Sequence, residues 1–199
     1  MISALFDSRN LILASASPRR RELLLHLGIP FEVRTIDFSE ELPLTGDPVQ
    51  IAKQIAILKG EEVRHGLVKG DVAITADTIV WCNGSLLGKP EDREEAAAML
   101  RSLSGKQHLV VTGVCLLSNT SVTSFCSETL VTFKILTDQE IYYYIDNYSP
   151  YDKAGAYGIQ EWIGFIGVER IEGSYFNVMG LPVQKLYLEL IKFLKNNND

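Results

Sequence analysis

The sequence of 199 residues lacks the patterns of several well-known functional classes. It has only three cysteines, at positions 82, 115 and 126, and none are spaced as in a CxxC motif. Its three histidines form no HExxH pair, and no GxSxG turn is present. The sequence therefore indicates neither a disulfide framework, nor a zinc site, nor a serine-esterase elbow.

Positive charge and long apolar runs are also scarce. The net charge of -6 argues against general binding to nucleic acids or acidic membranes. No apolar run approaches the roughly 18 residues of a membrane span. Asp7 and Arg9 interrupt any apolar stretch that could act as a secretory signal. We therefore expect a cytoplasmic protein that binds neither nucleic acid nor a membrane.

The chain does have a large apolar content, 46%, and a regular alternation of predicted elements. Strands and helices alternate early and hairpins follow, which predicts an α/β fold with a mixed, twisted sheet flanked by helices. No Pro/Gly-rich linker divides residues 1–199, so we expect a single domain, built as two lobes, with residues 195–199 as a frayed tail. Strands are expected at 11–15, 31–36, 72–76, 79–82, 86–87, 108–118, 122–135, 163–171 and 175–179, and helices at 18–27, 47–64, 92–103, 137–147 and 182–194. Asn83-Gly84 and Asn119-Thr120 are the expected hairpin turns.

The segment from Leu11 to Leu24 predicts an anion site. Ser17 has the position of an N-cap and Pro18 that of the first helical residue. Arg19 and Arg20 then lie in the first helical turn, where cations oppose the helix dipole. A phosphate bound by the free N–H groups would explain these arginines. An ordinary capped surface helix with solvated arginines is the alternative.

Asp77 is the one charged residue in the apolar run from Val72 to Val80. A buried carboxylate needs a partner, a metal or a position at a strand end. Ligand sites of α/β sheets lie outside the carboxyl ends of strands, where we expect this residue. An Asx turn with Thr78 is the alternative.

Three lysines and a glutamine lie in settings that suit a phosphorylated ligand. Lys59 follows small residues along one strip of its helix and could reach inward, or could remain a surface lysine. Lys89 lies in a rigid Gly-Lys-Pro turn that is not a Walker A loop. The Gly-rich segment 152–160 carries Lys153 and ends in Gln160, whose amide suits the edge of a nucleobase. The same segment could equally be a loop that packs on the sheet.

Seven motifs occur in order and together resemble the Maf family of nucleoside triphosphate pyrophosphatases. The motifs are SASPRRRELL at 15–24, ADTIV at 76–80, LGKP at 87–90, LSG at 103–105 with TGV at 112–114, DKAGAYGIQ at 152–160, GSY at 173–175 and GLP at 180–182. The resemblance implies a cytoplasmic, often dimeric protein, similar to inosine triphosphatases, with a nucleotide-binding cleft between two lobes. Such proteins convert a nucleoside triphosphate to the monophosphate and pyrophosphate with a divalent cation, Mg2+ or Mn2+.

The resemblance also implies roles for individual residues. Asp77 matches the proton acceptor of the family. Specificity for dTTP and UTP, with modified pyrimidine nucleotides as further candidates, is marked by Arg19, Thr78 and Gln160. The expected phosphate-binding residues are Ser15, Ser17, Arg20, Lys59, Lys89 and Lys153, and the expected metal ligand is Glu40. The chain departs from the family at Ser39, where Asp is frequent, and at Glu161-Trp162, where Gly is common.

These residues predict a reaction in which water attacks the α-phosphorus. Asp77 would deprotonate the water, and the basic residues and metal would neutralise the triphosphate. Two other hypotheses are a nucleotide-binding regulator without turnover, linked to cell division, and a scaffold protein. The acidic composition and the absence of an obvious apolar docking stripe give the scaffold little support.

Overall fold

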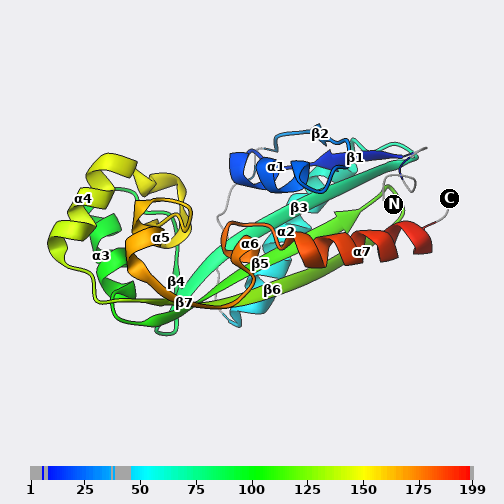
Figure 1. The fold of residues 1–199 in the computed structure, drawn as a ribbon. Helices are drawn as coiled ribbons and strands as arrows, with labels where there is room; N and C mark the ends of the chain where they lie inside the picture. The colour runs from blue at the N-terminus through cyan, green and yellow to red at the C-terminus, as the bar shows by residue number, and fades with distance from the viewer. Residues whose placement is uncertain (1–5, 7–8, 37, 39–45, 198–199) are drawn as a thin grey trace. The chain divides into compact units, whose positions relative to one another are not determined.

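The computed structural model describes residues 6, 9–36, 38 and 46–197. Within them, seven strands form one mixed sheet with helices beside it, which confirms the predicted fold class (Figure 1). The strand order is β2-β1-β3-β5-β6-β7, and β4 pairs with β3. The strands are β1 (Asn10–Leu13), β2 (Glu32–Val33), β3 (Asp71–Cys82), β4 (Ser85–Leu87), β5 (Gln107–Leu117), β6 (Val122–Phe133) and β7 (Val168–Gly173). The α-helices are α1 (Pro18–Leu25), α2 (Pro48–Arg64), α3 (Arg93–Leu103), α4 (Asp138–Tyr148), α5 (Trp162–Gly167), α6 (Tyr175–Val178) and α7 (Val183–Asn196).

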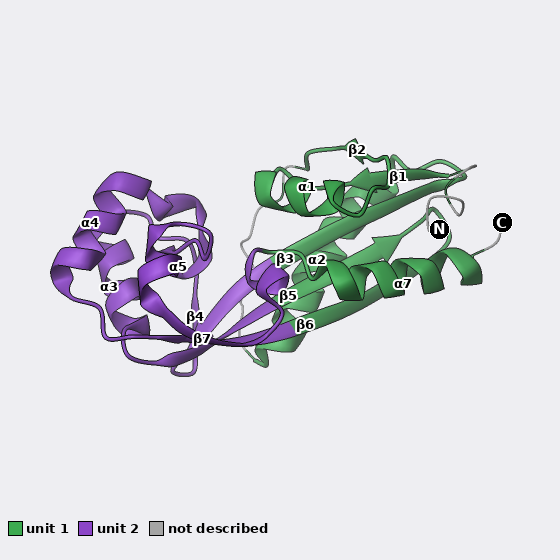
Figure 2. Cartoon of the chain, in the orientation of Figure 1, with its two compact units in different colours: residues 1–77, 112–127, 180–199 green, residues 78–111, 128–179 purple. Residues whose placement is uncertain are grey.

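The chain divides into two compact units, each assembled from separate segments (Figure 2). Unit 1 contains residues 1–77, 112–127 and 180–199, and unit 2 contains residues 78–111 and 128–179. The strands β3, β5 and β6 contribute residues to both units. The chain passes between the units inside these three strands, and once more between Met179 and Gly180, in the segment that joins α6 to α7.

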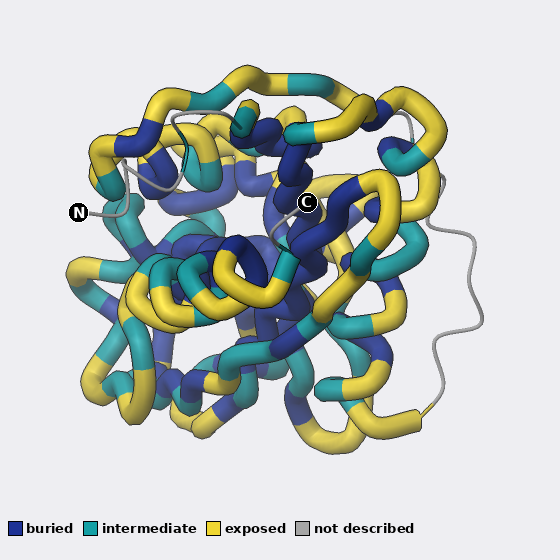
Figure 3. Tube along the Cα trace, turned by 90° about the vertical axis from the view of Figure 1, so that its right-hand side faces the viewer, coloured by how far each residue is buried: buried dark blue, intermediate teal, exposed yellow. Residues whose placement is uncertain are grey.

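Unit 1 is built on parallel strands covered by a helix. β1 pairs in parallel with both β2 and β3. Buried residues of β1, β3 and β5 form one apolar cluster with Ala56 and Val63 of α2. Successive residues of a strand point to opposite faces, so the buried Leu11, Leu13 and Ile74 face away from this cluster. Figure 1 shows α2 and α7 beside the strands of this unit. Figure 3 shows the buried residues concentrated in the interior of the trace.

Unit 2 contains antiparallel pairs and an aromatic core. β3 and β4 form the predicted hairpin at Asn83-Gly84, where both residues have positive φ. β7 runs antiparallel to β6. The buried His108 ring packs edge-on against Phe133 and Tyr157 and hydrogen-bonds the Tyr157 hydroxyl at 2.8 Å.

Three predicted elements are wrong in kind or extent. Residues 162–167 form helix α5, and only 168–173 form a strand, although 163–171 was expected as one. Residues 175–178 form helix α6, whose N-cap Ser174 accepts a hydrogen bond from the Asn177 amide, instead of the expected strand. β2 has two residues where six were expected. A β-type sequence pattern is a weak signal by itself, and at α6 the local Ser174 cap favours a helix.

Other differences are at element ends. β1 ends at Leu13 and α1 at Leu25, each two residues before the expected end. Helix α7 extends through Asn196, so its expected end at Leu194 is wrong by two residues. Asn197 accepts a hydrogen bond from Arg9 at 2.8 Å, which holds part of the segment expected to fray. Among the described residues, no helix is long and apolar enough to cross a membrane.

Candidate active site

The start of α1 has the capped geometry that the sequence predicts. The Ser17 side chain accepts a hydrogen bond from the Arg20 amide at 3.4 Å, and the buried Ser15 hydroxyl accepts one from the Ser17 amide at 3.2 Å. The Arg20 guanidinium donates to the Gly180 carbonyl at 2.8 Å and to Ser15 Oγ at 3.5 Å. Arg20 therefore has a structural role that links α1 to the segment before α7. Arg19 is half-buried in the same first turn.

Asp77 of β3 and Lys59 of α2 form an ion pair within unit 1. Lys59 Nζ lies 2.5 Å from Asp77 Oδ1, and each side chain is only 13% exposed. Lys59 thus points inward from α2, as the small residues on its helical strip allow, and is not a solvated surface lysine. The pair provides the partner that a carboxylate in an apolar strand requires.

Asp77 lies within a strand and not at its end. β3 is continuous from Asp71 to Cys82, so the predicted division into strands 72–76 and 79–82 is wrong. Thr78 follows Asp77 in the same strand and is half-buried. No glycine, proline or asparagine interrupts the strand before Asn83, so the backbone has no local reason to turn at Asp77.

Close packing of α2 against β3 and β5 fixes the position of Lys59. Asp47 caps α2 by accepting a hydrogen bond from the Val49 amide at 3.3 Å. The buried Thr75 hydroxyl donates to the Ala56 carbonyl at 2.6 Å. Gly113 of β5 allows closer approach, because a Cβ there would lie 2.1 Å from the Ala52 carbonyl oxygen. These contacts hold α2 on the strands one turn before Lys59.

In unit 2, the Gly-rich segment carries a buried lysine held by two carboxylates. Lys153 is 8% exposed, and its Nζ lies 2.7 Å from Asp152 Oδ1 and 3.0 Å from Glu161 Oε1. Its Nζ is therefore fixed in place and not solvated. The Gly155 amide donates to the Gly88 carbonyl at 2.9 Å, which ties this segment to the turn that carries the exposed Lys89.

Gln160 lies in a tight turn. The Glu161 amide donates to the Gly158 carbonyl at 2.9 Å, which makes Gln160 the third residue of a four-residue turn. Gly164 of α5 packs against the same turn, because a Cβ there would lie 2.0 Å from the Ile159 carbonyl oxygen. The half-buried Gln160 side chain is thus presented by a backbone held on two sides.

A contact that the sequence pattern does not indicate holds this turn. The Tyr144 hydroxyl of α4 donates to Glu161 Oε2 and accepts a hydrogen bond from the Gly158 amide at 2.9 Å. Burial first, and then the hydrogen bond to Glu161, raise the pKa of Tyr144, so its hydroxyl remains protonated as a donor. The tyrosine run 142–144 predicts helix packing, which is correct for the fully buried Tyr144, but its spacing gives no sign of this hydroxyl contact.

The predicted site residues fall into three groups. Unit 1 contains Ser15, Ser17, Arg19, Arg20, Lys59 and Asp77, and unit 2 contains Thr78, Lys89, Lys153 and Gln160. The predicted metal ligand Glu40 lies outside the described residues. The described residues contain no cluster of three or more His, Cys, Asp or Glu side chains that could hold a metal. Mg2+ is commonly bound by one or two carboxylates together with substrate phosphates, and the Asp77 carboxylate fits that kind of site.

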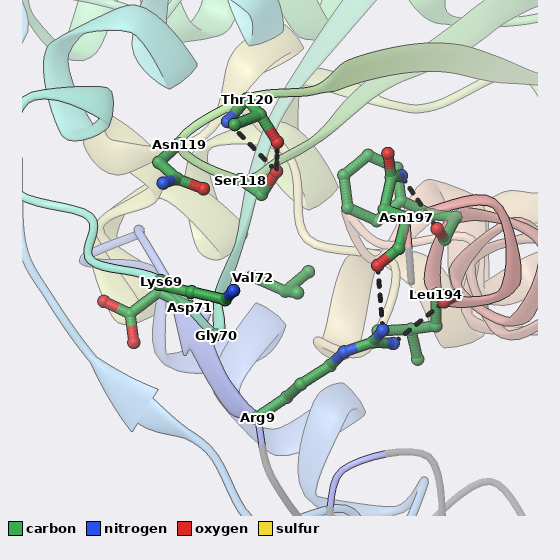
Figure 4. A pocket seen from close by; sticks show the side chains of 11 residues that line it. Arg9, Lys69, Gly70, Asp71, Val72, Ser118, Asn119, Thr120, Leu194 and Asn197 are labelled. Atoms are coloured by element: carbon green, nitrogen blue, oxygen red, sulfur yellow. Dashed lines mark hydrogen bonds between the residues drawn. The ribbon is translucent and has the colours of Figure 1, made fainter. Parts of the chain in front are cut away.

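A separate pocket of about 270 Å³ lies elsewhere in unit 1 (Figure 4). It is lined by the residues that precede β1 and β3, the turn between β5 and β6, and the end of α7. Arg9 donates across it to the carbonyls of Leu194 and Asn197, at 2.9 and 2.8 Å. None of the predicted site residues lines this pocket, and Arg9 there stabilises the C-terminal end of α7.

Comparisons with known proteins show what this chain is similar to. The dTTP/UTP pyrophosphatase of Bacteroides thetaiotaomicron is 52% identical over 187 residues, which cover 94% of this chain and 97% of the relative. The protein of the same name from Phocaeicola vulgatus is 55% identical over the same shares. The solved structure of the Staphylococcus aureus Ham1 protein aligns with a TM-score of 0.43 at 17% identity, over 63% of this chain and 72% of that one. A family model described as Maf-like protein matches residues 10–193, and the chain therefore belongs to the Maf family.

Proposed function

We propose that this chain is a nucleoside triphosphate pyrophosphatase that hydrolyses dTTP and UTP to the monophosphate and pyrophosphate. The observation that carries the proposal is the buried Asp77 carboxylate, held by Lys59 at 2.5 Å within an apolar strand. A structural role does not require a charge at this position, whereas proton transfer does. Relatives that are about half identical over nearly the whole chain are named for this activity.

In the proposed reaction, Asp77 accepts a proton from water as the water oxygen attacks the α-phosphorus. The bond between the water oxygen and the α-phosphorus forms, and the bond from that phosphorus to the bridging oxygen breaks. Pyrophosphate leaves with the electron pair of the broken bond. Lys59 holds the carboxylate in one position, which reduces the reorganisation needed during attack. No covalent enzyme intermediate is needed.

The basic residues neutralise the triphosphate, which carries about four negative charges. We assign this role to Arg19, Lys59, Lys89 and Lys153, with the α1 N-terminus and its residues Ser15, Ser17 and Arg20. A divalent cation, Mg2+ or Mn2+, would be held by Asp77 and Glu40 through carboxylate oxygens. When bound, it would supply further charge neutralisation at the phosphates.

Gln160 and Thr78 are the proposed readers of the base. Uracil and thymine present an N–H donor between two carbonyl acceptors, whereas cytosine presents an acceptor and an amino donor. The Gln160 amide can pair with the uracil pattern, and the Thr78 hydroxyl can add a contact. A mispaired base leaves buried polar groups unsatisfied, at a cost of about 1–3 kcal/mol each.

The test is a panel of nucleoside triphosphates incubated with Mg2+ or Mn2+, with pyrophosphate and orthophosphate measured separately. We expect pyrophosphate from dTTP and UTP, and roughly 5- to 150-fold lower kcat/KM for dCTP and GTP. Equal kcat/KM across the panel would contradict the proposed base contacts. Absence of pyrophosphate with every nucleotide would contradict the activity itself.

The names of the relatives favour this enzyme over the alternative of a regulator that binds nucleotides without turnover. In such a regulator, nucleotide binding would be measurable and pyrophosphate release would be absent. A cytoplasmic location and a homodimer belong to the same proposal, on the family resemblance alone. Size-exclusion chromatography with light scattering tests the dimer.

A further inference from the structure

Glu161 connects the Gly-rich segment with helix α4 through its two carboxylate oxygens. Oε1 lies 3.0 Å from the Lys153 ammonium, and Oε2 accepts the hydrogen bond from the Tyr144 hydroxyl. Lys153 is 8% exposed, and the Glu161 side chain is 26% exposed. Contacts of charged groups that are shielded from water are stronger than those on the surface.

The same carboxylate lies directly against the backbone of the Gln160 turn. A Cβ on Gly158 would lie 2.7 Å from the Glu161 carboxyl carbon, so only glycine leaves room for this carboxylate. The Gly158 amide donates to the Tyr144 hydroxyl at 2.9 Å. Gly158 is therefore held by the tyrosine on one side and contacted by the glutamate on the other.

We propose that Glu161 is a positioning residue, which acts with Tyr144 to hold Lys153 and the Gln160 turn in the arrangement that binds uracil and thymine nucleotides. The inference deepens the proposed function and rests on it. Glu161 acts through Lys153 and Gln160 and needs no contact with the substrate.

Loss of the Glu161 charge has a specific expected consequence. Among the described residues, Asp152 would remain as the ion-pair partner of Lys153, and its side chain is 63% exposed. The Lys153 ammonium would then occupy several positions, and the turn would lose one of its contacts. Because Asp77 and Lys59 are unchanged, substrate binding should weaken while the chemical step remains. The kinetic signature is a higher KM with nearly constant kcat.

A second tyrosine–glutamate pair on the same helix provides a matched control. Tyr142 of α4 donates to Glu94 Oε2 at 3.1 Å, and this pair is exposed and contains no predicted site residue. The variants Glu161→Gln and Tyr144→Phe therefore have direct counterparts in Glu94→Gln and Tyr142→Phe. Each pair of variants makes the same chemical change in the two places.

The experiment measures kcat and KM for UTP and dCTP in all four variants, with thermal unfolding as the control for folding. We expect Glu161→Gln to raise the KM for UTP about 10-fold and Tyr144→Phe about 5-fold, with kcat within about twofold. The preference for UTP over dCTP should fall in both, because the turn that carries Gln160 is loosened. The Glu94 and Tyr142 variants should match the parent enzyme within about twofold.

Two results would overturn the inference while the proposed function stands. In one, the Glu161 and Tyr144 variants have the same KM and the same UTP preference as their controls. In the other, activity on both nucleotides falls in proportion to the folded fraction, which indicates a purely structural role. If the parent enzyme releases no pyrophosphate from UTP, the proposed function fails first and this inference fails with it.

Discussion

The Lys59–Asp77 and Lys153–Glu161 pairs are two lysine–carboxylate contacts that are built in different ways. In unit 1, both partners lie on regular elements, α2 and β3, and helix-on-strand packing sets their positions. In unit 2, both partners lie on the irregular segment 152–161, and a side chain from α4 holds one of them. A pair on regular elements depends mainly on packing of the core. A pair on a loop depends on a few named hydrogen bonds, each of which one substitution can remove.

The largest expected difference between the two pairs is in the chemical step. Asp77→Asn keeps the shape of the side chain but removes the proposed proton acceptor. We expect kcat for UTP to fall about 100- to 10,000-fold while the nucleotide still binds. Steady-state kinetics and calorimetric titration with a non-hydrolysable UTP analogue measure the two effects separately.

Asp138→Asn is the matched control for this variant. Asp138 is an exposed carboxylate on α4 that pairs with Arg101 at 2.8 Å. Its substitution should leave kcat unchanged within about twofold. A folded Asp77→Asn enzyme with near-normal kcat would contradict the role of Asp77 as proton acceptor. Neither lysine–carboxylate pair would then have a role in the chemical step.

A pH experiment tests whether protonation of His108, in the core of unit 2, lowers the free energy of unfolding in acid. Burial lowers the pKa of His108 to about 4 in the folded state, against about 6.5 in the unfolded chain. As the pH falls, the unfolded state therefore binds a proton on His108 before the folded state does. The contribution of neutral His108 to the free energy of unfolding is complete above pH 6.5 and is lost as the pH falls toward 4. The loss at pH 4 is about 3 kcal/mol of unfolding free energy.

Urea unfolding at several pH values measures this loss, with His108→Gln as the reference. The difference between the parent and the variant should shrink as the pH falls from 6.5 to 4. A difference that is constant over this range would mean that His108 does not titrate as its burial requires.

Substitutions of two glycines in α5 test how rigidly the Gln160 turn is held. Gly164→Ala places a Cβ 2.0 Å from the Ile159 carbonyl oxygen, so backbone must move, at a cost of about 1–3 kcal/mol. Gly167→Ala meets side-chain atoms and no backbone, with a methyl of Leu136 nearest at 3.3 Å. We expect a lower Tm and a weaker preference for UTP over dCTP only in Gly164→Ala. Equal Tm values for the two variants would argue against tight packing at this turn.

The smallest predicted effect concerns the first turn of α1. Arg19→Ala should raise the KM for UTP about 10-fold with little change in Tm, because a cation near a helix N-terminus does not stabilise the helix. The exposed Arg21 of the same helix is the control, and Arg21→Ala should leave KM unchanged. A several-degree fall in Tm with normal kinetics in Arg19→Ala would indicate a structural arginine, as the contacts of Arg20 do for that residue.

Sequence patterns predicted the unit 1 pair better than the unit 2 pair. The strip of small residues on α2 predicts that Lys59 can reach inward, and an unpaired carboxylate in an apolar run predicts that Asp77 has a partner. The predicted strand end at Asp77 is wrong, because no turn-forming residue interrupts the chain there and β3 continues to Cys82. The Asn83-Gly84 hairpin, by contrast, has its own local signal and is confirmed.

The unit 2 contacts could not be predicted because they join residues with no periodic relation. Tyr144 and Glu161 are 17 residues apart, and neither residue type specifies the other. Residues 163–167 have a β-type pattern, yet Gly164 lets them form a helix that packs directly on the Ile159 carbonyl. Such close approaches depend on the assembled fold and not on local propensity.

The position of water attack tests the central claim most directly. Hydrolysis of UTP in ¹⁸O-enriched water, followed by mass spectrometry of both products, identifies the phosphorus that is attacked. Attack at the α-phosphorus with Asp77 as proton acceptor predicts one ¹⁸O in UMP and none in the pyrophosphate. Label in the pyrophosphate, or in orthophosphate from stepwise cleavage, would contradict this account.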